Sequence, residues 1–174
     1  MGRKMKLKAG DLLNKRTLII GGLKSGKTRL LAKVIKDLIK LIPKDEITVI
    51  DMAPNRIGKI GGKLIDYIDL SGIRYLSPER VYAPRTIGRN SEEVLRYAEE
   101  NKKVIKTILD NFKHNPSKVL IVNDLTLYLH AGDLADLMEC IKLAETFLGT
   151  AYYGDEFDDK GSGVNLREKR LTQR

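Results

Sequence analysis

A glycine-rich segment of eight residues constrains the fold of this chain more than any other feature. The segment fits the pattern G-x-x-x-x-G-K-[ST] and consists of Gly21, Gly22, Leu23, Lys24, Ser25, Gly26, Lys27 and Thr28. A β-like apolar run at 17–20 precedes it, and a helical apolar period over 29–41 follows it. Glycines let backbone N–H groups turn inward to form an anion nest, at which the following helix points its positive end. The pattern therefore predicts a strand, a phosphate-binding loop and a helix in succession.

Two side chains of this segment have specific expected roles. We expect Lys27 to reach the β- and γ-phosphates of a nucleotide, and the Thr28 hydroxyl to help hold Mg²⁺. The loop thus predicts ATP or another nucleoside triphosphate, together with Mg²⁺, as the ligand. The plain alternative is a glycine turn between a strand and a helix that binds nothing.

The length of 174 residues suits one α/β domain over 1–174, and an apolar content of 42% is typical of globular proteins. No apolar stretch approaches the length of a membrane span, and no apolar signal core follows the basic N-terminus. We therefore expect a cytoplasmic protein. Cys140 is the single cysteine, which excludes an intrachain disulfide, and we expect it in the core.

The net charge of +9 favours an acidic partner. Nucleic acid, an anionic membrane surface and nucleotide alone all fit this charge. Lysine-rich surfaces also occur in thermophilic proteins, where they form ion pairs. Nucleic acid is therefore a candidate partner that the charge allows and does not require.

Continuous apolar runs indicate where the sheet lies. The runs 47–50 and 119–122 are rich in β-branched residues and do not alternate with polar residues, which predicts strands buried on both faces of a parallel sheet. A further strand is expected at 146–150. Together with the strand at 17–20, these runs predict the centre of an α/β domain.

Helical periods and loops fill the rest of the chain. A long helix is expected from Asn90 or Ser91, because Asn90 and Glu93 have capping-box spacing. The other expected segments are a loop at 52–63, an irregular insert at 64–90 with one or two short strands or turns, a helix at 132–145, an acidic loop at 154–163 and a short basic helix at 164–174. This order of elements predicts a three-layer α/β/α fold with a mainly parallel sheet.

The run 119–122 ends at Asn123 and Asp124 and looks like a Walker B strand. With the glycine segment, it makes the chain resemble the P-loop NTPase superfamily. The resemblance implies that Asp124 lies beside the phosphate loop and holds Mg²⁺ through water. The alternative is that Asp124 caps the next turn.

The strand order along the chain resembles the RecA-like and additional-strand ATPases. In those proteins a polar residue that ends the fourth strand senses the γ-phosphate, which implies this role for Thr150. Many of them place a catalytic Glu directly after the Walker B Asp, where this chain has Leu125. That departure weakens the expectation of unaided hydrolysis. Asp51, which ends the strand at 47–50, is the substitute that could polarise the attacking water, although it equally suits a loop cap.

The leading hypothesis is a Mg²⁺-dependent, ATP-binding P-loop NTPase that couples nucleotide binding or hydrolysis to a partner. The second is a small-molecule or nucleotide kinase with an acceptor site in 52–90. Its candidate phosphate clamps are Arg56, Arg74, Arg80, Arg85 and Arg89. The third is a nucleotide-regulated switch with little hydrolysis. A GTPase is disfavoured: the D-x-x-G fragment at 69–72 is not followed by N-K-x-D.

An arginine often neutralises charge in phosphoryl transfer. Arg85, Arg167 and Arg170 are candidates for this role, either within one chain or across a subunit interface. The second possibility would require a homo-oligomer, which the sequence allows.

Overall fold

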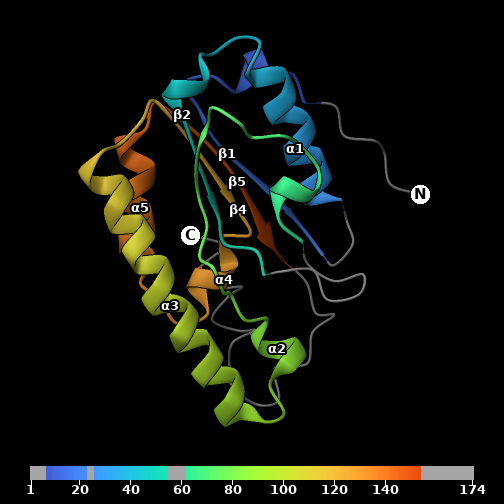
Figure 1. Cartoon of the computed structure of the whole chain (residues 1–174), viewed down its shortest axis with the longest axis vertical. Helices are drawn as coiled ribbons and strands as arrows, with labels where there is room; N and C mark the ends of the chain where they lie inside the picture. The colour runs from blue at the N-terminus through green and yellow to red at the C-terminus, as the bar shows by residue number, and fades with distance from the viewer. Residues whose placement is uncertain (1–6, 23–25, 55–61, 154–174) are drawn as a thin grey trace.

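Five parallel strands form the centre of the protein in the computed structural model, which describes residues 7–22, 26–54 and 62–153. Their order across the sheet is β1-β5-β4-β2-β3 (Figure 1). The strands are β1 (Arg16–Gly21), β2 (Ile47–Asp51), β3 (Arg74–Leu76), β4 (Val119–Asn123) and β5 (Thr146–Tyr152). The last strand along the chain, β5, is thus inserted between β1 and β4. This all-parallel sheet confirms the expected α/β class.

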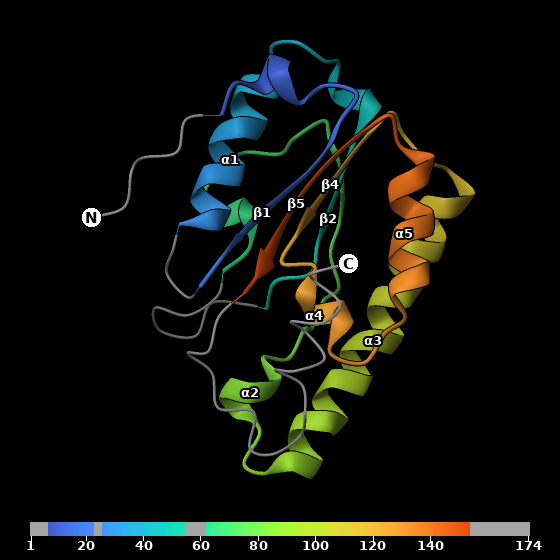
Figure 2. The same ribbon diagram turned by 180° about the vertical axis from the view of Figure 1, so that it is seen from behind.

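Helices cover both faces of the sheet (Figures 1 and 2). Helix α1 (Lys27–Leu38) lies on one face, and α3 (Ser91–His114) and α5 (Leu134–Leu143) lie on the other. The remaining helical segments are α2 (Pro84–Ile87), α4 (Thr126–Leu129) and the 3₁₀ turns η1 (Ala9–Leu12), η2 (Lys44–Glu46) and η3 (Leu64–Asp66). The expected three-layer arrangement is therefore present.

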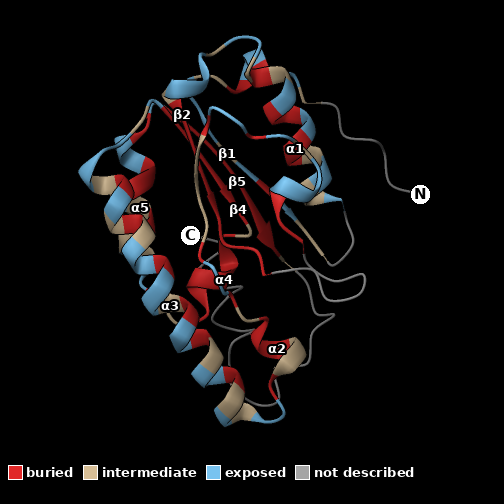
Figure 3. Cartoon of the chain, in the orientation of Figure 1, coloured by how far each residue is buried: buried red, intermediate tan, exposed pale blue. Residues whose placement is uncertain are grey.

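Strand β4 shows how the two cores form, because its side chains alternate between them. Val119 and Ile121 pack in the core beside α1, whereas Leu120 and Val122 pack in the core beside α3 and α5. All of β4 is buried, as are β2 and β5 (Figure 3). By the same alternation Asn123 belongs to the face that α1 covers, which brings it towards the start of α1.

The long helix begins as its sequence predicts. Asn90 is the N-cap of α3, and its Oδ1 accepts a hydrogen bond of 2.9 Å from the N–H of Glu93. The reciprocal half of the capping box is replaced, because Glu93 Oε1 accepts from the N–H of Arg89 instead of that of Asn90. Asn90 nevertheless provides a side-chain acceptor at the start of α3.

Three helices differ from the sequence expectation. The helix expected over 29–41 is α1, which begins at Lys27 and ends at Leu38. The helix expected over 132–145 is shorter, since α5 begins after Asp133 and ends at Leu143. The short helix α4 was not expected, because its four residues are too few to show an apolar period. The insert over 64–90 contains η3, β3 and α2, in agreement with the expectation of short strands and turns.

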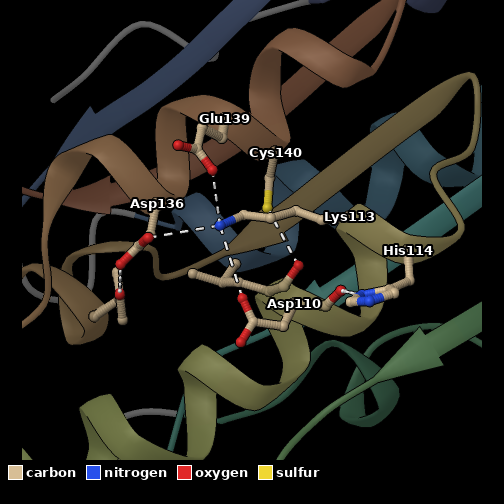
Figure 4. A network of polar contacts seen from close by, with 8 residues as sticks. Asp110, Lys113, His114, Asp136, Glu139 and Cys140 are labelled. Carbon is tan, nitrogen blue, oxygen red and sulfur yellow. Dashed lines mark hydrogen bonds and ion pairs between the residues drawn. The ribbon is translucent and has the colours of Figure 1, made fainter.

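An ion-pair network connects α3 with α5 (Figure 4). Lys113 Nζ lies 3.7 Å from a carboxylate oxygen of Asp110, 3.5 Å from one of Asp136 and 3.0 Å from one of Glu139. Asp136 also accepts a hydrogen bond of 2.8 Å from the Tyr128 hydroxyl, which adds α4 to the network. Cys140 is buried beneath it, as expected, and burial raises the pKa of its thiol to about 11.

Several expectations fall on residues outside the described ranges. They concern Leu23, Lys24, Ser25, Arg56, Arg167, Arg170 and the segments 154–163 and 164–174. Within the described ranges, no helix is long and apolar enough to cross a membrane. The same ranges hold no group of three or more His, Cys, Asp or Glu side chains placed to bind a metal ion.

Candidate functional site

The glycine segment begins at the end of β1 and continues into α1, as its pattern predicts. Strand β1 ends at Gly21, and α1 begins at Lys27. Gly26 has a φ of 83°, in the left-handed region that favours glycine. This residue therefore sets the entry into α1. The positive end of α1 lies at the carboxyl edge of the sheet, where parallel α/β folds bind ligands.

The ammonium group of Lys27 folds back over the loop. Its Nζ donates hydrogen bonds to the carbonyl oxygens of Gly21, at 3.0 Å, and Gly22, at 2.7 Å. It also lies 5.8 Å from the centre of the Tyr152 ring, at the end of β5. The positive charge is therefore held at the point where the loop leaves the sheet, next to the N-terminus of α1.

Thr28 meets β4 through Asn123, a residue to which the sequence assigned no role. The Thr28 hydroxyl lies 3.4 Å from Asn123 Oδ1, and that oxygen also accepts a hydrogen bond of 2.8 Å from the Thr150 hydroxyl. The Asn123 side chain is fully buried, and its Nδ2 donates to Asp51 Oδ1 at 3.0 Å. Asn123 thus connects the start of α1 with the carboxyl ends of β2, β4 and β5. The continuous apolar run of β4 gave no signal for it, because the position of α1 decides which side chain at the end of β4 faces Thr28.

Asp124 lies one residue beyond the contact with Thr28. Its φ is 56°, a left-handed conformation that Asp tolerates better than most residues. Its N–H donates to the Thr150 hydroxyl at 2.8 Å, and its Oδ1 accepts from the Thr126 hydroxyl at 3.2 Å. Asn123 therefore makes the contact with Thr28, and a metal-binding role for Asp124 stays a prediction.

Thr150 is buried at the end of β5 and organises the turn after β4. Its hydroxyl donates to Asn123 and accepts from the N–H of Asp124, while its carbonyl accepts from the N–H of Leu125 at 2.9 Å. These three bonds hold the turn after β4 against β5. They place Thr150 beside the expected metal site, and its role as a γ-phosphate sensor stays a prediction.

Asp51 is fully buried at the end of β2 and accepts four hydrogen bonds. The donors, at 2.7 to 3.2 Å, are the N–H groups of Ala53 and Leu64, the Tyr75 hydroxyl and Asn123 Nδ2. A carboxylate offers about four acceptor sites, so these contacts fill it. Of the two roles that the sequence allowed, this arrangement favours the loop cap over the activation of an attacking water.

Lys63 completes the buried network around Asp51. Its Nζ donates to the carbonyl of Ala53 at 2.7 Å and to the Ser77 hydroxyl at 2.6 Å. Burial lowers the pKa of Lys63, although the charges of Asp51 and Asp66 act in the opposite direction. Sequence reasoning missed this residue because a lysine in a Gly- and Lys-rich loop resembles an ordinary solvated one. Lys63 and Asp51 together fix the chain on both sides of 55–61.

Three of the arginines proposed as a clamp for an acceptor phosphate, Arg74, Arg85 and Arg89, do not converge. Arg74 opens β3 at the amino end of the sheet and donates to Asn111 and Asn115. Arg89 is exposed and pairs with Glu93 at 3.0 Å. Arg85 differs from both, because its side chain is buried and lies 5.1 Å from the centre of the Tyr152 ring. Of these three, only Arg85 shares a neighbour with Lys27 of the phosphate loop.

The parallel sheet and the residues at its carboxyl edge are consistent with an α/β fold of the P-loop NTPase type. No protein-family model matches the chain, and no curated protein matches its sequence. Among solved structures, the Pif1 helicase from Candida albicans matches 97% of this chain with 14% sequence identity and a TM-score of 0.40. The match covers 38% of that helicase chain, so the present chain spans well under half of its length. A likeness this distant adds nothing to the assignment of function, which rests on the residues described above.

Proposed function

We propose that this protein is a Mg²⁺-dependent, ATP-binding P-loop NTPase of the additional-strand class. The observation that carries the proposal is the contact between Thr28 and Asn123. It joins the glycine segment to the end of the Walker B-like strand. The position of β5 between β1 and β4 supports the additional-strand class. The backbone of residues 21–28 and the ammonium group of Lys27 would bind the phosphates.

The side chains beside Thr28 suit a Mg²⁺ ion. Thr28 Oγ1 and Asn123 Oδ1 are hard oxygen donors that lie 3.4 Å apart, and Mg²⁺ prefers such ligands together with water and phosphate oxygens. Bound Mg²⁺ would neutralise charge on the transferring phosphoryl group. We propose that Thr28 and Asn123 lie next to the ion and that Asp124 holds it through water.

A second role for Asp124 follows from the position of Asn123. If Asn123 takes the place of the Walker B carboxylate, the next position, where many related ATPases have a catalytic Glu, is Asp124 and not Leu125. We propose that Asp124 orients the attacking water, while Asp51 fixes the loop after β2. Under this proposal, Asp124→Asn lowers turnover by at least about tenfold and weakens Mg²⁺-ATP binding by a smaller factor.

Binding of Mg²⁺-ATP, followed by calorimetry, tests the proposal. The wild-type protein should bind ATP in the presence of Mg²⁺, and Lys27→Ala should weaken binding by at least about tenfold, because a charge-assisted contact to phosphate is lost. Arg89→Ala is the matched control, since it removes a positive charge from the exposed surface. Equal affinity of Lys27→Ala and the wild type would refute the proposed site.

Nucleic acid is the partner that we propose for the coupled step, because the net charge is +9. Turnover of ATP should then rise when single-stranded DNA or RNA is added, and this stimulation should fall steeply as salt increases. Rapid turnover that depends on one small metabolite would support the kinase alternative instead. Tight binding with little turnover under every condition would support the switch.

A further inference from the structure

We propose that Arg85 is a catalytic arginine that the insert supplies to the phosphate loop of the same chain. The inference rests on the proposed function. In the reaction, water attacks the γ-phosphorus, the bond from that phosphorus to the bridging oxygen breaks, and ADP and inorganic phosphate leave. Arg85 would contact the γ-phosphoryl oxygens and neutralise the charge that they share as the bond breaks.

Burial is the first observation that separates Arg85 from an ordinary surface arginine. Arg85 is 7% exposed, and it is the single buried arginine among those that the structure describes. An arginine side chain stays charged in proteins. The fold therefore places a permanent positive charge inside the molecule, at the start of α2.

The Tyr152 ring shows where that charge is directed. The guanidinium of Arg85 lies 5.1 Å from the ring centre, and Lys27 Nζ lies 5.8 Å from the same centre. Tyr152 ends β5 in register with Gly21, the first residue of the glycine segment. Arg85 and Lys27 therefore both lie near one ring, beside the positive end of α1. A polyanion bound at this end of α1 would lie within the field of both side chains.

Helix α3 holds the segment that carries Arg85. The Asn101 side chain, 1% exposed, accepts a hydrogen bond from the N–H of Tyr82 and donates one to its carbonyl, both at 2.8 Å. The rings of Tyr82 and Tyr97 also pack against each other at a tilt of 38°, with centres 4.7 Å apart. The segment before α2 is therefore fixed to α3 through Tyr82, and Arg85 lies near the Tyr152 ring at the end of β5. Asn101 is a positioning residue in this arrangement.

The test separates catalysis from nucleotide binding and from folding. ATP turnover and Mg²⁺-ATP affinity are measured for the wild type, Arg85→Ala, Arg85→Lys and the surface control Arg89→Ala. We expect Arg85→Ala to lower kcat at least about 100-fold, with an affinity within about threefold of the wild type. Arg85→Lys should restore only a small part of kcat, because lysine lacks the planar fork of donors. Arg89→Ala should behave as the wild type.

A second measurement does not depend on rapid turnover. Aluminium fluoride bound with ADP imitates the transferring phosphoryl group. The ratio of the affinity for ADP with aluminium fluoride to the affinity for ADP alone therefore measures the contact that we assign to Arg85. Arg85→Ala should lose most of this preference and keep its affinity for ADP. Asn101→Ala should lose part of it, with Arg85 still present.

Two results would overturn the role of Arg85 and leave the proposed function intact. One is an Arg85→Ala protein that turns over ATP and binds the fluoride complex as the control does. The other is full rescue by Arg85→Lys, which would mean that a positive charge alone is needed. A wild-type protein that does not bind Mg²⁺-ATP would instead contradict the proposed function itself.

Discussion

The Thr28 hydroxyl lies 3.4 Å from Asn123 Oδ1, although 95 positions separate the two residues along the chain. The contact crosses from the start of α1 to the end of β4. Asn123 supplies an oxygen there without the negative charge of a carboxylate, so its attraction for Mg²⁺ is weaker than that of an aspartate would be. The geometry therefore leads us to expect a nucleotide site that needs more Mg²⁺ than one with a carboxylate at this position.

The first prediction concerns Asn123 itself. Asn123→Ala should lower the free energy of unfolding by about 2–3 kcal/mol, because it leaves Asp51 and Thr150 with buried polar atoms that lose a partner. The same variant should raise the Mg²⁺ concentration needed for half-maximal ATP binding. Urea unfolding and Mg²⁺ titrations measure the two effects. Asn115→Ala, at an exposed position after α3, is the control and should change neither quantity by much, because Asn115 accepts from Arg74 through its backbone carbonyl.

The strands that carry this site could be predicted from the sequence because their apolar runs are continuous. The run at 119–122 correctly predicted β4, and the glycine segment predicted where β1 ends and α1 begins. Asn123 could not be assigned by that approach, because the Walker B pattern ends in an acidic residue and therefore points to Asp124 and not to the asparagine before it. The decision between the two depends on which face of β4 each residue occupies, and this requires the position of α1.

Contacts between segments that are distant along the chain could not be predicted from the sequence. In the sequence, Lys63 resembles the other solvated lysines of its loop. In the structure, it is buried beside Ser77 and the carbonyl of Ala53. Arg85 could be suggested as one of several arginines, yet only the packing of α2 near Tyr152 distinguishes it. Such residues are identified by three-dimensional neighbours that have no periodic signal in the chain.

The second prediction treats Asp51 as a structural anchor. Asp51→Ala should lower the free energy of unfolding by about 3 kcal/mol or more, since four donors lose their acceptor and Lys63 loses a nearby negative charge. Tyr75→Phe removes one of those donors and should cost about 1 kcal/mol. Chemical unfolding measures both. A nearly normal stability of Asp51→Ala, with turnover abolished, would restore the role in activating water.

The third prediction concerns alkaline pH. Burial, followed by neighbouring carboxylates, raises the pKa of the Tyr75 and Tyr128 hydroxyls above the ordinary value of 10.0. A pKa that is raised in the folded state means that the folded protein holds the proton more tightly. The associated stability is therefore fully present below about pH 10 and is lost as the pH rises further.

Tyrosinate absorbance during an alkaline titration tests this expectation. Tyr75 and Tyr128 should stay protonated until the protein unfolds, so fewer than the seven tyrosines of the chain should ionise in the native state. Tyr75→Phe and Tyr128→Phe should each reduce the amplitude that appears on unfolding and leave the native-state amplitude unchanged. Ionisation of all seven near pH 10 in the folded protein would show that these hydroxyls are not buried.

The fourth prediction concerns the network between α3 and α5. Lys113→Met should lower the free energy of unfolding by about 1 kcal/mol or more, because it leaves three neighbouring carboxylates without their shared cation. Lys40→Met is the control, since Lys40 is exposed and lies 3.9 Å from Asp37. Thermal unfolding of both variants at low and high salt measures the difference. Equal effects of the two substitutions would mean that the network contributes no more than a surface pair.

A crystal structure with Mn²⁺ in place of Mg²⁺ and a non-hydrolysable ATP analogue tests the central claim most directly. Anomalous scattering locates the metal without reference to the protein. We predict that Mn²⁺ lies beside Thr28 Oγ1 and Asn123 Oδ1, with the β- and γ-phosphates against the backbone of 21–28 and the ammonium group of Lys27. A nucleotide bound elsewhere, or a metal position away from Thr28, would contradict this account.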